Sequence, residues 1–73
     1  MIVKVCGLRD PDNIRAVERL PVDLCGFIFY PRSPRCVPDD EFHAAAVRSC
    51  RRPAVGVFVD ASPAEMLRTA ERF

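Results

Sequence analysis

The sequence predicts an α/β fold built on a parallel sheet, and two observations carry this prediction. Three short apolar runs, at residues 2–6, 24–29 and 54–59, are rich in β-branched and aromatic side chains. The second and third runs are apolar at nearly every position, as in strands whose two faces are both covered. Helical patterns follow each run, and strands that alternate with helices indicate parallel pairing through helical crossovers.

Each helical pattern has a recognisable start. Asp10 is suited to cap the first helix, because Pro11 then stands at the first helical position. The second helix is expected to begin near Asp39, where a run of acidic residues favours a helix N-terminus. Ser62 and Glu65 have the spacing of a capping box, which marks the start of the third helix.

The same patterns predict which side of each helix is apolar. In the first helix the apolar positions repeat every three residues until Pro21 ends the helix: Ile14, Val17 and Leu20. The second helix has a modest apolar face: Phe42, Ala45, Ala46 and Cys50. The third has a stronger stripe: Met66, Leu67, Ala70 and Phe73. We expect all three faces to pack against the sheet.

Composition narrows the class of partner. The chain has 73 residues, 49% of them hydrophobic, and its 11 Lys and Arg against 10 Asp and Glu give a net charge of +1. That balance gives no electrostatic reason to expect nucleic acid or an anionic membrane as a partner. No apolar run approaches the roughly 18 residues of a membrane span, and no signal peptide is visible, so we expect a cytoplasmic protein. The four cysteines and single histidine lack metal-site spacing, so no metal and no disulfide framework is expected.

The number of strands bears on the architecture. Three strands are fewer than the five or six typical of a doubly wound sheet or the eight of a barrel of about 250 residues. We therefore expect either a piece of a larger α/β domain or a chain that needs partners to complete one. Neither a dinucleotide-binding nor a Walker-type glycine motif follows the first strand. A flavodoxin-like sheet stays open on pattern alone. Polar residues after each strand, at Cys6, residues 30–35 and Asp60, favour a barrel, because barrel active sites lie at that rim.

Three segments, KVCGLRDPDNIRAV, GFIFYPRSPRCV and VGVFVD, together resemble the phosphoribosylanthranilate isomerase family and cover most of the chain. The resemblance implies the N-terminal βαβαβα portion of a (β/α)8 TIM barrel, incomplete in this chain. Residues 1–73 are then a single partial domain with the first three strands and helices. It also implies an aldose–ketose isomerase of tryptophan biosynthesis. That enzyme converts N-(5-phosphoribosyl)anthranilate, a small phosphosugar–anthranilate substrate, by an Amadori rearrangement and without a cofactor.

The resemblance assigns roles to individual residues. It places the family's general base on Cys6 and the arginine that holds the anthranilate carboxylate on Arg35. A strand end can hold a base near the proton that it removes, and a guanidinium binds a planar carboxylate through two parallel hydrogen bonds. Lys4, two residues before Cys6, is expected on the same strand face, where its charge would favour the reactive thiolate. The alternative is a lysine that extends to solvent at the bottom of the barrel.

Other residues have weaker claims to the site. Asp60 ends the third strand and either touches the active-site rim or simply precedes the helix cap. Arg32 is interpreted as solvated surface. The remaining cysteines are expected to have packing roles: Cys25, Cys36 and Cys50.

The resemblance also leaves functions unfilled. The family's general acid, an aspartate on a later strand, and its phosphate site lie beyond residue 73. We therefore expect the 73-residue chain alone to be inactive. Two alternatives stay open: a non-catalytic partial-barrel module that self-associates through open strand edges, and another phosphosugar barrel enzyme.

Overall fold

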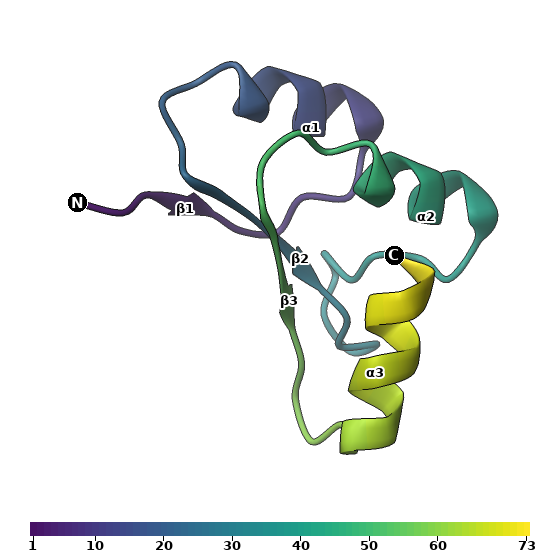
Figure 1. Ribbon diagram of the computed structural model, residues 1–73. Coiled ribbons are helices and arrows are strands. Elements are labelled where there is room, and N and C mark those ends of the chain that lie inside the picture. Colours follow the sequence, from purple (N-terminus) through teal and green to yellow (C-terminus); the bar gives the residue numbers. More distant parts are fainter.

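The computed structural model describes all residues from 1 to 73. Figure 1 shows a small parallel sheet whose strands alternate along the chain with three helices. The strands are β1 (Lys4–Val5), β2 (Leu24–Ile28) and β3 (Ala54–Val57). The helices are α1 (Pro11–Glu18), α2 (Glu41–Arg48) and α3 (Pro63–Arg72). The predicted order of elements is therefore confirmed.

The sheet has the strand order β1-β2-β3, and every pairing is parallel. Lys4 pairs with Leu24, and β2 continues in register along β3 from Cys25 with Ala54 to Ile28 with Val57. Alternate residues of β2 thus point to opposite faces. We call the face of Cys25 and Phe27 the helix face, and the face of Leu24, Gly26 and Ile28 the open face.

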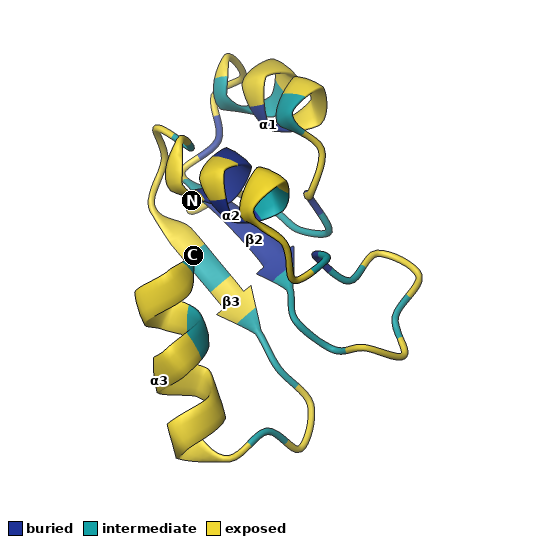
Figure 2. Ribbon diagram, turned by 90° about the vertical axis from the view of Figure 1, so that its right-hand side faces the viewer, coloured by how far each residue is buried: buried dark blue, intermediate teal, exposed yellow.

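The core forms on the helix face. Cys25 and Phe27 are almost completely buried, and they belong to a cluster that also includes Ile14 of α1 and Val47 of α2. Figure 2 shows this burial as dark blue on β2 and on the sides of α1 and α2 that lie next to it. The open face has no helix over it, so the residues of β2 at its two ends are only half-buried.

The third helix lies over the same face of the sheet. Phe73, which follows α3, packs against the core cluster, and its ring centre lies 4.9 Å from that of Phe29. Phe58 extends this aromatic group, with its ring centre 5.5 Å from Phe29. A doubly wound fold places helices on both faces, and the flavodoxin order begins 2-1-3. Here the three helices lie over one face and the order is β1-β2-β3, so neither a doubly wound fold nor a flavodoxin-like sheet fits. The arrangement is that of successive βα units of a barrel.

The helices begin within one residue of the predicted positions. Asp10 caps α1, and the Ser62 hydroxyl accepts a hydrogen bond from the backbone N–H of Glu65 at 3.1 Å. The second cap is Asp40, one residue after the predicted position, and its carboxylate accepts from the backbone N–H of His43 at 2.8 Å. Three of the first-turn donors are thus satisfied by side chains, which is why the helices begin where they do.

The predicted apolar faces need correction. In α2 the buried positions are Ala44, Ala46 and Val47, whereas Phe42 is 65% exposed. At about 100° per residue, Phe42 lies about 140° around the helix from Val47, so the side of α2 that meets the sheet does not include Phe42. α3 buries none of its own residues, and Leu67 is 61% exposed. Of the predicted stripe, Phe73 packs against the core cluster as expected.

The predicted strands are also longer than the observed ones. β1 begins only at Lys4, because the Val3 N–H donates to the Asp23 carboxylate at 2.7 Å and not to a neighbouring strand. In α1 the helix ends at Glu18, so Leu20 lies beyond it and is exposed.

No helix in the chain has the length and apolar character needed to cross a membrane.

Candidate active site

Cys6 lies directly after β1, against the middle of β2. A Cβ built on Gly26 would stand 2.8 Å from the Cys6 Sγ and 3.0 Å from its Cα. Since Gly26 is on the open face, the thiol is on that face too, away from the core formed with α1 and α2. The backbone N–H of Leu8 donates to the Gly26 carbonyl at 3.2 Å and holds this part of the chain to β2.

Arg35 lies over the next residue, Gly7. Its Nη1 would be 2.5 Å from a Cβ on Gly7, and its Cζ 3.0 Å. Gly7 also has φ 87°, a left-handed conformation that glycine adopts without steric cost. Cys6 and Arg35 were predicted from two motifs that lie far apart in the sequence. The fold brings them to adjacent positions at the end of β1.

The loop after β2 folds back to deliver Arg35. The Ser33 N–H donates to the Tyr30 carbonyl at 2.9 Å, and the Ser33 hydroxyl accepts from the Arg35 N–H at 3.2 Å. The loop returns to the sheet where the Val37 N–H donates to the Ile28 carbonyl at 2.8 Å. This turn chemistry, typical of Ser, sets the direction in which Arg35 leaves the backbone.

The two supporting residues are placed differently. Lys4 pairs with Leu24 and is two residues from Cys6, so register and alternation put Lys4 and Cys6 on the same face. Lys4 is exposed. Asp60 follows β3, is exposed and has φ 54°, which Asp tolerates better than most residues. It takes part in no hydrogen bond or ion pair, so nothing ties it to Cys6 or Arg35.

Two of the other cysteines, Cys25 and Cys36, are poorly suited to act as a base. Burial, together with a hydrogen bond to the Cys50 thiol, raises the pKa of Cys25 to about 11. Burial also raises the pKa of Cys36, with Arg9 acting in the opposite direction. Both groups therefore stay protonated at neutral pH. Cys25 is fully buried in the core, as predicted.

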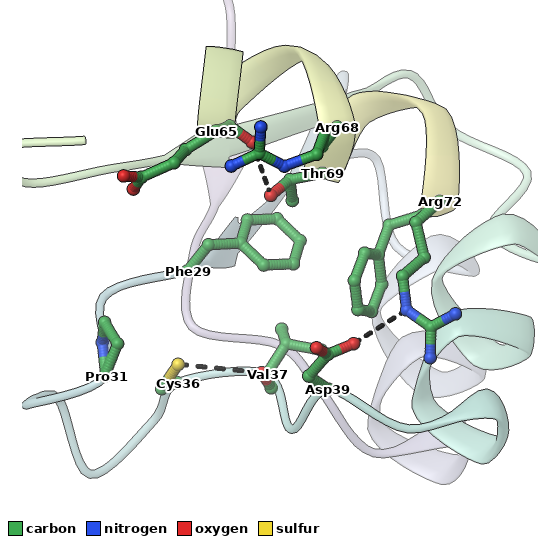
Figure 3. A pocket seen from close by; sticks show the side chains of 10 residues that line it. Phe29, Pro31, Cys36, Val37, Asp39, Glu65, Arg68, Thr69 and Arg72 are labelled. Atoms are coloured by element: carbon green, nitrogen blue, oxygen red, sulfur yellow. Dashed lines mark hydrogen bonds and ion pairs between the residues drawn. The ribbon is translucent and has the colours of Figure 1, made fainter. Parts of the chain in front are cut away.

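The larger of two cavities lies elsewhere, between the loop after β2 and α3. It has a volume of about 400 Å³, and Figure 3 shows Phe29, Arg68 and Arg72 among its lining residues. Arg72 donates to the Asp39 carboxylate across one end at 2.7 Å. Neither Cys6 nor Arg35 lines this cavity, so it is separate from the predicted site. The chain also holds no group of three or more His, Cys, Asp or Glu that could bind a metal ion.

Sequence reasoning missed two contributors to this geometry, Gly26 and Ser33. A glycine inside an apolar strand often marks a place where another backbone approaches closely, and Gly26 interrupts such a run. Ser33 begins a Ser-Pro-Arg turn, and its side-chain acceptor could have been inferred from Asx- and Ser-type turns. Both signals were present, but neither points to a site by itself.

Comparison with known proteins gives this site a context. Residues 3–73 match the family model of N-(5'-phosphoribosyl)anthranilate (PRA) isomerase. The N-(5'-phosphoribosyl)anthranilate isomerase of Phocaeicola vulgatus is 44% identical over 73 residues, which cover 100% of this chain and 34% of that protein. The chain thus spans about a third of the length of the curated relatives that it matches.

Solved structures agree. Crystalline monomers of the dimeric phosphoribosylanthranilate isomerase from Thermotoga maritima superimpose with a TM-score of 0.86 at 30% identity, over 99% of this chain and 37% of that one. A phosphoribosyl anthranilate isomerase in complex with reduced 1-(o-carboxyphenylamino)-1-deoxyribulose 5-phosphate gives a TM-score of 0.71 at 28% identity, over 99% of this chain and 38% of that one. The fold is accordingly an incomplete TIM barrel, and the chain belongs to the N-(5'-phosphoribosyl)anthranilate isomerase family.

Proposed function

We propose that these 73 residues act within a complete barrel, meaning a chain as long as the curated relatives, that isomerises N-(5-phosphoribosyl)anthranilate to its 1-deoxyribulose phosphate product. The observation that carries the proposal is the placement of Cys6 beside Gly7, with the Arg35 guanidinium directly over that glycine. A base and a carboxylate anchor thus share one end of the sheet, where barrel enzymes have their active sites.

In this mechanism the Cys6 thiolate removes the proton from the second carbon of the ring-opened sugar. The ring-opened sugar is an imine, with a double bond between its first carbon and the anthranilate nitrogen. The electron pair of the broken C–H bond forms a new double bond between the second and first carbons, while the π pair of the imine moves to the nitrogen, which takes up a proton. Protonation of the first carbon and loss of the hydroxyl proton then give the aminoketose, so that no atom or electron is gained overall. The thiol must reach that proton at about 3 Å, which a position fixed on β2 favours.

Arg35 is proposed to hold the carboxylate of the anthranilate ring. Support comes from the ligand of one solved family structure, which carries both a carboxyphenyl group and a 5-phosphate. A guanidinium presents two parallel donors to a carboxylate, whereas an ammonium presents a point charge. The family match favours this substrate over that of another phosphosugar barrel enzyme.

Lys4 is proposed to favour the thiolate through its charge, from its place on the open face with Cys6. Asp60 is proposed as a weaker contributor to the rim, with the support only of its position after β3. A cytoplasmic location and self-association of the isolated chain through its strand edges also stay predictions. The absent general acid and phosphate site are proposed to come from the remainder of the complete barrel.

Turnover of N-(5-phosphoribosyl)anthranilate by the complete barrel tests the proposal. Cys6→Ala is expected to lower kcat by about 10² to 10⁴ with little change in KM, because a base acts mainly in the transition state. Cys50→Ala is the matched control and should keep normal turnover. Wild-type turnover by the Cys6 variant would refute the assignment, and an inactive wild-type barrel would favour the non-catalytic module.

A further inference from the structure

We infer that Gly26 is a positioning residue of the site: its missing side chain lets the end of β1 lie close against β2, which holds the Cys6 thiol on the open face. The inference rests on the proposed function for its catalytic consequence. The structural part of the inference does not depend on the proposed function: the Cys6 thiol occupies the space that a side chain at residue 26 would need.

The contact at Gly26 is tight and involves backbone. A Cβ there would be 2.8 Å from the Cys6 Sγ, and 3.0 Å from both its Cα and its Cβ. Real Cβ atoms essentially never approach another atom closer than 3.0 Å, so a methyl group at residue 26 must displace its neighbour. Gly26 is buried, and β2 is the central strand, paired on both sides.

Cys6 has little freedom to move away from such a methyl group. Cys6 follows the last residue of β1, and two positions later Leu8 is hydrogen-bonded to the Gly26 carbonyl at 3.2 Å. Leu8 is itself buried in the core. The chain is therefore fixed on both sides of Cys6, so a methyl group at residue 26 would move the thiol or turn it to another rotamer.

Gly56 on β3 offers the contrasting case. It pairs with Phe27 and so lies on the helix face. A Cβ there would meet the Phe58 ring at 3.0 Å and the Phe29 ring at 3.5 Å. An aromatic ring edge can turn aside by a small rotation, whereas the backbone of Cys6 cannot. The same substitution, glycine to alanine, therefore perturbs the open face at residue 26 and the helix face at residue 56.

The catalytic consequence follows from distance. Displacing a reacting group by about 1 Å can cost roughly a hundredfold in rate. The methyl group at residue 26 must push Cys6 away by several tenths of an ångström, and we expect this displacement to lower kcat by about 10- to 100-fold. The three atoms nearest to the new Cβ all belong to Cys6 and none to Arg35, the proposed carboxylate anchor, so KM should change far less.

The test compares Gly26→Ala with Gly56→Ala in the complete barrel. We expect a reduced kcat with nearly unchanged KM for the first variant and near-normal kinetics for the second. Iodoacetamide alkylation, followed cysteine by cysteine by peptide mass spectrometry, gives a readout that needs no turnover. The rate at Cys6 should differ from wild type in Gly26→Ala only. Unchanged kcat and an unchanged Cys6 alkylation rate would overturn the inference.

A swap variant covers the case in which Gly26→Ala does not fold. Cys6→Gly combined with Gly26→Ala removes the Sγ and the Cβ that obstruct the new methyl group. Its thermal unfolding midpoint should therefore exceed that of Gly26→Ala alone. If the swap is no more stable, Cys6 is not what Gly26 accommodates. Failure of the proposed function looks different: Cys6→Ala would retain turnover while the swap still recovered stability.

Discussion

Replacing Gly7 by alanine should affect stability and ligand binding by two separable routes. The residue has φ 87°, where an L side chain is strained. A left-handed conformation costs a residue other than glycine about 1–2 kcal/mol, so we expect the free energy of unfolding of the complete barrel to fall by about that amount. Urea unfolding would measure this loss, which has nothing to do with Arg35.

The second effect of the Gly7→Ala substitution is on ligand binding, through the Arg35 guanidinium. The new Cβ would lie 2.5 Å from Arg35 Nη1, 3.0 Å from Cζ and 3.2 Å from Cδ, so the side chain must move away. Because a long side chain moves cheaply, this displacement should appear in ligand affinity and not in stability. Arg35→Ala is expected to cost about 1.5–3 kcal/mol of binding free energy, the value of charge-assisted hydrogen bonds. Gly7→Ala should cost about 1.4 kcal/mol, a tenfold loss of affinity.

Titration calorimetry with a reduced, non-reacting product analogue would measure both losses. In the Arg35→Ala background the clash is gone, and Gly7→Ala should then leave affinity nearly unchanged while its effect on unfolding persists. Arg35→Lys should recover little affinity, since an ammonium lacks the two parallel donors. If Gly7→Ala weakens binding equally in both backgrounds, the glycine does not act through Arg35, and the reasoning is refuted.

Further predictions concern the core, a helix cap and the isolated chain. Cys25→Ala should lower the free energy of unfolding by about 1 kcal/mol, close to the loss of one buried methylene, while turnover per folded molecule stays normal. His43, through its backbone N–H and its ring, holds the pKa of Asp40 below its ordinary value of 3.8. The charged carboxylate therefore stabilises the fold above about pH 4, and this stabilisation is lost as the pH falls further. Asp40→Asn should consequently show a weaker loss of stability than wild type in urea unfolding between about pH 5 and 2, and parallel curves would contradict this. The isolated 73-residue chain exposes 5055 Å², against about 4500 Å² for a compact protein of its mass. It should be inactive and should aggregate, form oligomers or be molten in sedimentation and amide exchange, whereas a sharp monomer with protected strand amides would contradict the prediction.

The elements that could be predicted from the sequence are those set by local chemistry. Asp10 and Ser62 cap their helices where expected, because side-chain acceptors next to proline fix a helix start within a few residues. The order of strands and helices follows from the apolar runs. The faces were harder to predict, since apolar residues of α2 lie on more than one side of the helix and only the side of Val47 meets the sheet, which leaves Phe42 exposed.

The site shows the same division. Cys6 and Arg35 could be named from motifs, but the sequence does not show that the guanidinium rests on Gly7 or that the thiol rests on Gly26. Those contacts depend on strand register and on the path of a loop, which only the folded chain sets. Asp60 illustrates the limit: its place after β3 suggested a role that no contact in the fold supports.

The two faces of the sheet have separate tasks, and this explains why the site is where it is. Cys25 and Phe27 point to the helices and form the core, so their positions tolerate only apolar groups that fill space. Gly26 lies between them and points to the other face, where it is small enough for Cys6 to pack. Alternating residues of one strand thus serve the core and the proposed site. A substitution at Cys25 should therefore change the free energy of unfolding, and one at Gly26 should change the placement of Cys6, the proposed base.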